Sequence, residues 1–262
     1  MPLSIHLFGP LSFHIYGTMI AVGVVVALLG LARDKKMQTL LSLDQLFFLV
    51  GLGIASGIAG GKLLFIFEML VDGDCSSDLF AFWNAGFSVL GAFIAVPLVV
   101  GSYMYRHRLP IIASFDRACI FIPLTFAISR LGCFFAGCCY GLPTNGWYAV
   151  TYTNPECLAP TDYSIHPTQL YSAGLEFLLF LFLILWGQKK CTKTGQLFGL
   201  YLTLMSTERF LVDFLRADRT FVATNLSFSQ LAAVGTGIAG VIILLTATHT
   251  TLFNRSSRSI RA

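Results

Sequence analysis

Seven apolar runs, each close to the length of a membrane span, constrain this sequence more than any other feature. A helix needs about 20 consecutive apolar residues to cross the hydrocarbon core of a bilayer. Only 11% of the 262 residues are charged, whereas soluble domains carry about 25%. We therefore expect an all-α integral membrane protein with seven transmembrane helices. The predicted spans are residues 11–32, 45–70, 85–105, 113–135, 169–186, 195–215 and 227–247.

The remaining sequence offers little room for a second domain. It contains no internal repeat, no low-complexity tract and no long hydrophilic segment. We therefore expect residues 1–262 to form a single polytopic membrane domain. The first 20 residues contain no Lys or Arg, so we do not expect a cleavable signal peptide.

Basic residues alternate between the connections and predict the orientation. Lys and Arg follow the first, third, fifth and seventh runs, and the connections after the second and fourth runs carry none. By the positive-inside rule the N-terminus lies outside and the C-terminus is cytoplasmic. The net charge of +4 thus reflects topology rather than nucleic-acid binding. Arg216 and Arg219, after the sixth run, break the alternation, which hints at another role for them.

Arg130 lies near the far end of the fourth apolar run. A charge within a membrane span costs about 2.5–3.5 kcal/mol on insertion scales, so it marks a candidate functional site. The glycines that follow, Gly132, Gly137 and Gly141, permit close approach of a ligand or backbone. A fixed cation in a membrane cavity favours an anionic ligand. The alternative is that Arg130 reaches the interface or pairs with an acid for packing.

The sixth run carries a second group of charges. Arg209, Asp213 and Arg216 are spaced i, i+4 and i+7, which places them on one helical face. One interpretation is a structural ion pair between Arg209 and Asp213. The other makes Arg209 a second cation in the cavity of Arg130, held in place by Asp213. The residues alone leave both open.

The segment from His166 to Tyr171, His-Pro-Thr-Gln-Leu-Tyr, opens the fifth run. Pro167 suits the first turn of a helix, where its missing N–H has no cost. His166 then precedes the helix, with Gln169 and Tyr171 about one turn away. A histidine at an interface is often only a satisfied polar group, but this compact polar string favours a site.

Seven cysteines are present, and five of them are predicted at or near the outer face, where disulfides can persist. The spacing of Cys133, Cys138 and Cys139 differs from the Cys-x2-Cys pattern of zinc sites, so we expect no metal and no cofactor. Packing residues, outer disulfides and a reactive thiol remain as alternatives. In the second run, Gly53, Gly57 and Gly61 form a small-residue face that predicts close helix packing.

Several strings together resemble the bacterial prolipoprotein diacylglyceryl transferase family, over most of the chain. The segment from Ser129 to Gly141 is similar to the family signature Gly-Arg-x-Gly-Asn-Phe-x-Asn-x-Glu-x-x-Gly, and the segment from His166 to Tyr171 to its His-Pro-Ser/Thr-Gln-Leu-Tyr. The other matching strings are Phe8 to Gly17, Gly60-Gly61-Lys62, Pro143-Thr144, and Arg209 to Asp213 with Arg216.

The resemblance implies a fold, a reaction and site residues. Seven helices would surround a lipid-binding cavity in the bacterial inner membrane. Diacylglyceryl would move from phosphatidylglycerol to the lipobox cysteine of a lipoprotein precursor. Arg130 and Arg209 would hold the phosphate, and His166 would assist the thiol. Substrate-binding residues would be Tyr16, Arg130, Gly141, Gln169, Tyr171, Arg209 and Asp213.

The departures from the family pattern concern polar residues. Cys133 and Ala136 stand where the signature has asparagine, and Cys138 where it has glutamate. Leu90 replaces the histidine of the third span, and Asp213 is a shortened glutamate. Two alternatives therefore remain beside the transferase. One is a lipid-binding or transport protein without the reaction, and the other is a thiol-redox membrane protein.

Overall fold

The computed structural model describes residues 4–8, 11–71, 87–155, 157–221 and 226–259. It divides into two compact units, which we describe separately. One comprises residues 1–31 and 115–262, and the other residues 32–114. All the predicted site residues fall in the first of these, which we call the large unit.

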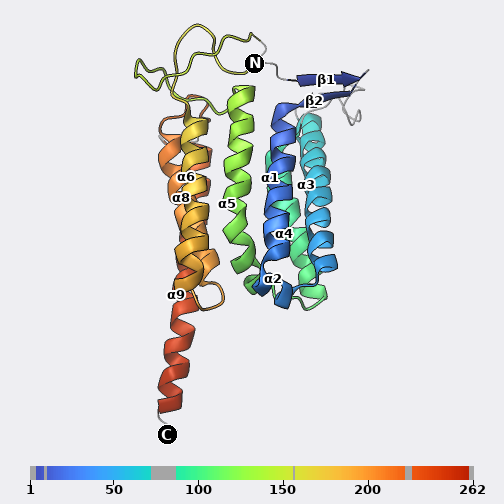
Figure 1. Cartoon of the computed structure of the whole chain (residues 1–262), viewed down its shortest axis with the longest axis vertical. Coiled ribbons are helices and arrows are strands. Elements are labelled where there is room, and N and C mark those ends of the chain that lie inside the picture. Colours follow the sequence, from blue (N-terminus) through green and yellow to red (C-terminus); the bar gives the residue numbers. More distant parts are fainter. Residues whose placement is uncertain (1–3, 9–10, 72–86, 156, 222–225, 260–262) are drawn as a thin grey trace. The chain divides into compact units, whose positions relative to one another are not determined.

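The large unit is a set of long helices preceded by a small hairpin (Figure 1). Strands β1 and β2 pair in antiparallel fashion. The chain was predicted to be all-α, and this hairpin is an exception to that prediction. The elements are β1 (Ser4–Phe8), β2 (Leu11–His14), α1 (Ile15–Arg33), α5 (Ile111–Ala136), α6 (Thr168–Phe182), the π-helical turn η2 (Leu183–Gly187), α7 (Gln188–Lys190), α8 (Gln196–Asp213) and α9 (Phe228–Ser259).

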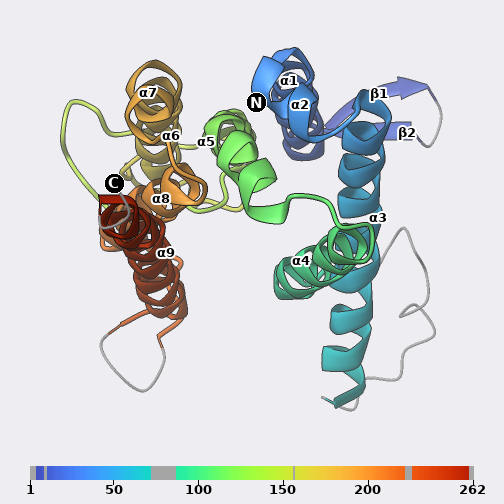
Figure 2. The same cartoon turned by 90° about the horizontal axis from the view of Figure 1, so that it is seen from below.

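Helix α8 packs against both α6 and α9, and α5 lies beside α6 and α8 in both views (Figures 1 and 2). Small residues let α8 and α9 approach closely. A Cβ on Gly199 would lie 2.8 Å from the Gly240 carbonyl oxygen, and one on Gly240 would lie 2.8 Å from the Thr203 amide nitrogen. These glycines thus allow the backbones of the two helices to meet, as small residues do in membrane helix pairs.

A carboxylate from α5 fixes the start of α8. Asp116 accepts hydrogen bonds from the backbone N–H groups of Gly195 and Phe198, the latter at 2.8 Å. The first N–H groups of a helix lack partners within the helix, so this acid performs the role of an N-cap from a neighbouring element. The contact sets where α8, which carries Arg209, begins.

The smaller unit contains α2 (Lys35–Leu40), α3 (Leu43–Val71) and α4 (Val89–Arg106). The predicted packing role of the glycines in α3 is confirmed for Gly57, whose Cβ would contact Val96 of α4 at 3.3 Å. Gly60 and Gly91 mark the closest approach, because a Cβ on Gly60 would lie 2.7 Å from the Gly91 carbonyl oxygen.

Five helical segments in the described part of the chain are long and apolar enough to cross a membrane. They are α1, α3, α5, the continuous segment from α6 through α7, and α9 as far as Thr248. The apolar part of α4, Leu90–Arg106, is shorter. Every predicted run nevertheless overlaps a helix, although residues 11–14 of the first run form β2 instead.

Candidate functional site

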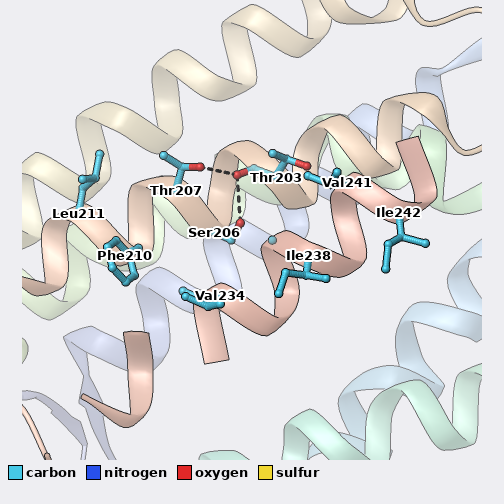
Figure 3. Close-up of a pocket in the computed structure, with 11 residues that line it drawn as sticks. Thr203, Ser206, Thr207, Phe210, Leu211, Val234, Ile238, Val241 and Ile242 are labelled. Atoms are coloured by element: carbon cyan, nitrogen blue, oxygen red, sulfur yellow. Dashed lines mark hydrogen bonds between the residues drawn. The ribbon is translucent and has the colours of Figure 1, made fainter. Parts of the chain in front are cut away.

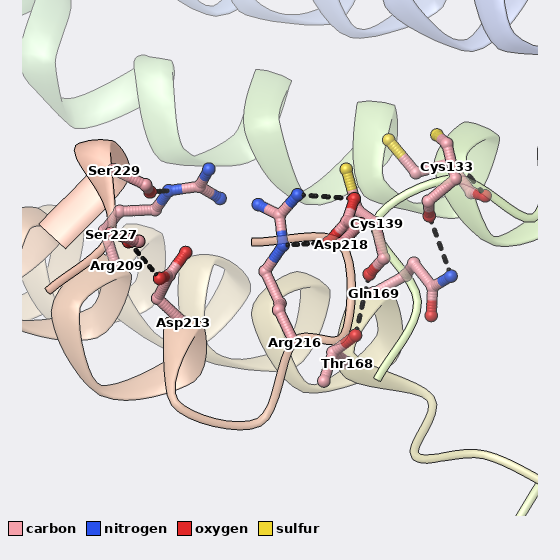
Figure 4. A network of polar contacts seen from close by, with 11 residues as sticks. Cys133, Cys139, Thr168, Gln169, Arg209, Asp213, Arg216, Asp218, Ser227 and Ser229 are labelled. Atoms are coloured by element: carbon pink, nitrogen blue, oxygen red, sulfur yellow. Dashed lines mark hydrogen bonds and ion pairs between the residues drawn. The ribbon is translucent and has the colours of Figure 1, made fainter. Parts of the chain in front are cut away.

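Three arginines of the large unit lie within electrostatic range of one another. Arg130 is on α5, Arg209 is on α8, and Arg216 follows the end of α8. Arg209 experiences the positive charges of both Arg130 and Arg216. The guanidinium groups of Arg209 and Arg216 point toward each other beside α5 (Figure 4). We call these three residues the arginine cluster. The like charges repel at this range, so the cluster favours an anion.

The three guanidinium groups differ in the hydrogen bonds that they make. Arg209 donates from Nε to Ser229 Oγ at 2.9 Å. Arg216 makes two hydrogen bonds to Asp218, at 2.9 and 2.8 Å. Burial alone would lower the pKa of Arg216, but the bond to Asp218 raises it above its ordinary value. Among the described residues Arg130, partly buried, forms no hydrogen bond or ion pair. Arg130 is thus the cation with the most free donors.

Asp213 does not hold Arg209 by a direct bond, contrary to the predicted orienting contact. Its carboxylate, 1% exposed, accepts a hydrogen bond from Ser227 Oγ. Ser227 in turn accepts from the backbone N–H of Gln230 at 3.1 Å. Asp213 therefore fixes the start of α9, and Ser229 on that helix then reaches Arg209. The acid acts on Arg209 only through space.

Two carboxyl groups accompany the arginines, one buried and one partly buried. Glu208 on α8 accepts from Ser172 Oγ at 2.7 Å. Glu176 on α6 is 5% exposed, and its Oε2 has no hydrogen-bond partner. Both acids interact electrostatically with Arg130 and Arg209. Sequence reasoning missed Glu176, although an acid inside an apolar run was a visible signal.

The loop after α5 is fastened to the start of α6. Gly137 and Cys139 have positive φ angles of 72° and 58°, which turn the chain sharply after the helix. Thr168 Oγ1 donates to the Cys139 carbonyl at 2.7 Å, and Gln169 Nε2 donates to the Cys138 carbonyl at 2.8 Å. The Gln169 Oε1 is buried without a partner. It therefore remains available to accept a hydrogen bond from a ligand.

Gly141 lies where three backbone segments meet. It pairs with Arg216 in an isolated bridge, and its N–H donates to the His166 carbonyl at 3.1 Å. A Cβ here would lie 2.6 Å from that same carbonyl oxygen and 2.9 Å from Thr168 Cγ2. Only glycine fits this position. It is a structural requirement of the loop that positions Arg216.

His166 belongs to an aromatic group rather than to the arginine cluster. Its ring stacks on Tyr148 with centroids 5.4 Å apart, and its Nδ1 lies 3.3 Å from the Tyr171 hydroxyl. Within the described part of the chain, no hydrogen bond or ion pair joins His166 to the three arginines. The predicted residues thus form two groups, which are linked through the backbone of Gly141.

Tyr16 on α1 belongs with the arginine cluster. Its phenol lies within electrostatic range of Arg130 and of the thiols of Cys133, Cys138 and Cys139. The side chain is 43% exposed, so it remains accessible. Its backbone packs against α5, where a Cβ on Gly132 would lie 3.2 Å from the Tyr16 Cα.

The sulfur atoms of Cys133, Cys138 and Cys139 all lie within 4.8 Å of one another. The Cys133 and Cys138 thiols lower the pKa of Cys139 by hydrogen bonding, and the charges of Arg216 and Arg130 act in the same direction. The six described cysteines are free thiols. Cys75 lies outside the described residues, so the prediction of outer disulfides is not tested there.

An apolar groove of about 400 Å³ runs between α8 and α9 (Figure 3). Phe210, Val234 and Ile238 contribute apolar side chains to its lining. Its hydroxyl groups are satisfied within α8, since Ser206 and Thr207 both donate to the Thr203 carbonyl, at 3.0 and 2.7 Å. The groove therefore suits an apolar ligand. Its lining includes Phe210, which follows Arg209 in the sequence of α8.

Comparison with known proteins agrees with the resemblance. Residues 2–246 match the model of the prolipoprotein diacylglyceryl transferase family. The chain belongs to this family. A phosphatidylglycerol–prolipoprotein diacylglyceryl transferase of Clostridium tetani is 35% identical over 242 residues, covering 92% of this chain and 96% of the relative. Transferase 2 of Clostridium perfringens is 32% identical, covering 90% and 91%, and a Bordetella parapertussis transferase is 31% identical, covering 90% and 92%.

In this member of the prolipoprotein diacylglyceryl transferase family, the structure brings some of the predicted site residues together. Arg130 lies within electrostatic range of both Arg209 and Tyr16, and their assignment to a site stays a prediction. The sequence indicated a role for Arg216 only because this residue breaks the alternation of basic residues between the connections. Ser229 was missed because a serine in a long apolar run carries no distinct signal.

Proposed function

We propose that this chain is a phosphatidylglycerol–prolipoprotein diacylglyceryl transferase of the bacterial inner membrane. The observation that carries the proposal is the arginine cluster, in a chain of this family, with Arg130 free to bind an anion. Guanidinium groups bind phosphate oxygens through paired hydrogen bonds and stay charged at all relevant pH values. An apolar groove beside the same helix suits an acyl chain.

The reaction replaces a carbon–oxygen bond with a carbon–sulfur bond. The thiolate of the acceptor cysteine attacks the glyceryl carbon that bears the phosphate, and glycerol phosphate leaves with the bonding electron pair. Negative charge grows on the departing phosphate oxygens. We assign Arg130 and Arg209 to that charge, because preorganised donors in a dry site are usually the largest catalytic contribution.

The other residues are assigned to binding and proton transfer. Tyr16, Gln169 and Asp213 would border the headgroup, Asp213 acting through the start of α9. Gly141 and Tyr171 would shape the entrance on the outer side. We propose that His166, beside Tyr171, takes the proton of the acceptor thiol.

The proposed setting follows the charge pattern. Seven spans would place the N-terminus outside and the C-terminus in the cytoplasm. The site would then face the outer leaflet, where the lipoprotein precursor arrives. Leu90, at the position of the family histidine, lies in the smaller unit. A family member without that histidine needs another proton acceptor, which is why we assign His166 this role.

The test is transfer of labelled diacylglyceryl from phosphatidylglycerol to a lipobox peptide by the purified protein. Arg130→Ala and Arg209→Ala should each lower kcat by about 100- to 1000-fold, the loss typical of one preorganised donor. Arg219→Ala is the matched control, since Arg219 stacks on Phe221 instead. Wild-type rates in both cluster variants would refute the assignment. Lipid binding by the wild type without any transfer would instead indicate a lipid-binding protein.

A further inference from the structure

The three thiols at the end of α5 form a compact group that the proposed reaction does not use. Cys133 is in the last turn of α5 and is 5% exposed. Cys138 and Cys139 follow the turn at Gly137, and both are partly exposed. The positive φ angles of Gly137 and Cys139 fold the chain back over the helix end. This fold brings residues from two backbone directions together, and we call them the thiol cluster.

The separation of the sulfur atoms is close to that of a metal–thiolate site. With metal–sulfur bonds of about 2.3 Å, ligand sulfurs lie about 3.8 Å apart in tetrahedral and about 4.0 Å apart in trigonal geometry. The three sulfurs here lie within 4.8 Å of one another. Side-chain rotation of less than about 1 Å per sulfur would therefore close the site, without any change in the backbone.

Two cations lie close to one member of the thiol cluster, since Arg130 and Arg216 both act electrostatically on Cys139. Three thiolates carry three negative charges, and nearby cations lower the cost of placing those charges together. A bound cation would remove the mutual repulsion of the sulfurs themselves. The linear spacing argued against metal binding, but the turn at Gly137 brings the sulfurs together despite that spacing.

We propose that Cys133, Cys138 and Cys139 bind a thiophilic d10 metal ion, either Zn(II) or Cu(I). Thiolate sulfur is the ligand type that selects these ions. Binding exchanges three S–H protons for three metal–sulfur bonds, and no electrons are transferred. The ion would tie the loop at Cys138 and Cys139 to the end of α5. Their carbonyls accept from Gln169 and Thr168, so the ion would also stiffen the contact with α6.

Cd(II) serves as a spectroscopic probe, because its thiolate complexes absorb in the ultraviolet by charge transfer. The reduced, metal-free protein in detergent is titrated with Cd(II), followed by competition with Zn(II) or with Cu(I). We expect one ion per chain and release of three protons. Displacement at lower concentration by one of the two competitors identifies the ion, and a rise in Tm on binding is a second readout.

Single substitutions test the location of the site. Cys133→Ser, Cys138→Ser and Cys139→Ser should each weaken binding by more than the roughly 100-fold upper range of outer-shell changes. Cys191→Ser is the matched control and should bind as the wild type does. The absence of charge transfer in the wild type would overturn the proposal, as would equal binding by all three cluster variants. Loss of two free thiols without metal would show a disulfide instead. None of these readouts depends on the transferase reaction.

Discussion

Gly141→Ala tests the closest backbone contact of the loop that pairs with Arg216. The new Cβ would lie 2.6 Å from the His166 carbonyl oxygen and 2.9 Å from Thr168 Cγ2. Backbone atoms cannot rotate away as a flexible side chain can. The segment around Gly141 must therefore move from His166, with loss of the hydrogen bonds of 3.1 and 2.9 Å between these strands.

The magnitude follows from two contributions. Overpacking a tight site costs about 1–3 kcal/mol, and each lost hydrogen bond costs about 1 kcal/mol. We therefore expect the free energy of unfolding to fall by about 3–5 kcal/mol, from overpacking and two lost hydrogen bonds together. At about 2–4 °C per kcal/mol for a chain of this size, Tm should fall by about 6–20 °C. Transfer activity should fall with it, because Arg216 pairs with Gly141 through the backbone.

The matched control is Gly174→Ala, in the middle of α6. A Cβ at Gly174 has nothing within 4 Å, and alanine is favoured over glycine in a helix by about 0.5–1 kcal/mol. Its Tm should equal or exceed that of the wild type in the same thermal scan. If Gly141→Ala melts within about 2 °C of the wild type, less than 1 kcal/mol has been lost and the reasoning from close contact is refuted.

Three further predictions concern single contacts. Asp116→Ala should lower the free energy of unfolding by about 2–4 kcal/mol, because two N–H donors at the start of α8 lose their acceptor, and thermal scans should place Asp116→Asn between this variant and the wild type. Burial raises the pKa of Tyr152 to about 12 from an ordinary 10. Its stabilising contribution is therefore complete below pH 10 and lost as the pH rises to about 12, so the stability difference between wild type and Tyr152→Phe should shrink over that interval. Ser229→Ala should lower kcat/KM about fivefold, as expected for about 1 kcal/mol lost at Arg209, and unchanged kinetics would contradict the contact.

Hydrophobic length predicted most of the helices because it depends only on local composition. Each apolar run overlaps a helix, since a chain in lipid must satisfy its backbone groups internally. The exception at residues 11–14, which form β2, comes at the start of the first run. By hydrophobicity alone, a short apolar strand at this position cannot be distinguished from the first turn of a helix. The total of seven spans and their orientation stay predictions.

Local spacing was a weaker guide to the contacts of the site. Arg209 and Asp213 are four residues apart on α8, and that spacing suggested a pair between them. Instead, each side chain bonds to a serine near the start of α9, Ser229 and Ser227 respectively. These partners depend on how α8 packs against α9, and the sequence of α8 alone cannot predict that packing. The thiol cluster escaped prediction for a similar reason, because a turn rather than a spacing rule brings its sulfurs together.

The different partners of the three arginines indicate which charge the site is built to bind. Asp218 forms an ion pair with Arg216, whereas among the described residues Arg209 bonds only to the neutral Ser229 and Arg130 makes no hydrogen bond or ion pair. A phosphodiester carries one negative charge, and the glycerol phosphate that leaves in the proposed reaction carries two. Two guanidinium groups that are not held in an ion pair therefore interact more strongly with the leaving group than with the intact lipid. Interactions that strengthen along the reaction lower its barrier, whereas uniform binding does not. Neutralising Arg209 should thus reduce kcat more than it weakens lipid binding, and an equal loss in both would contradict this role.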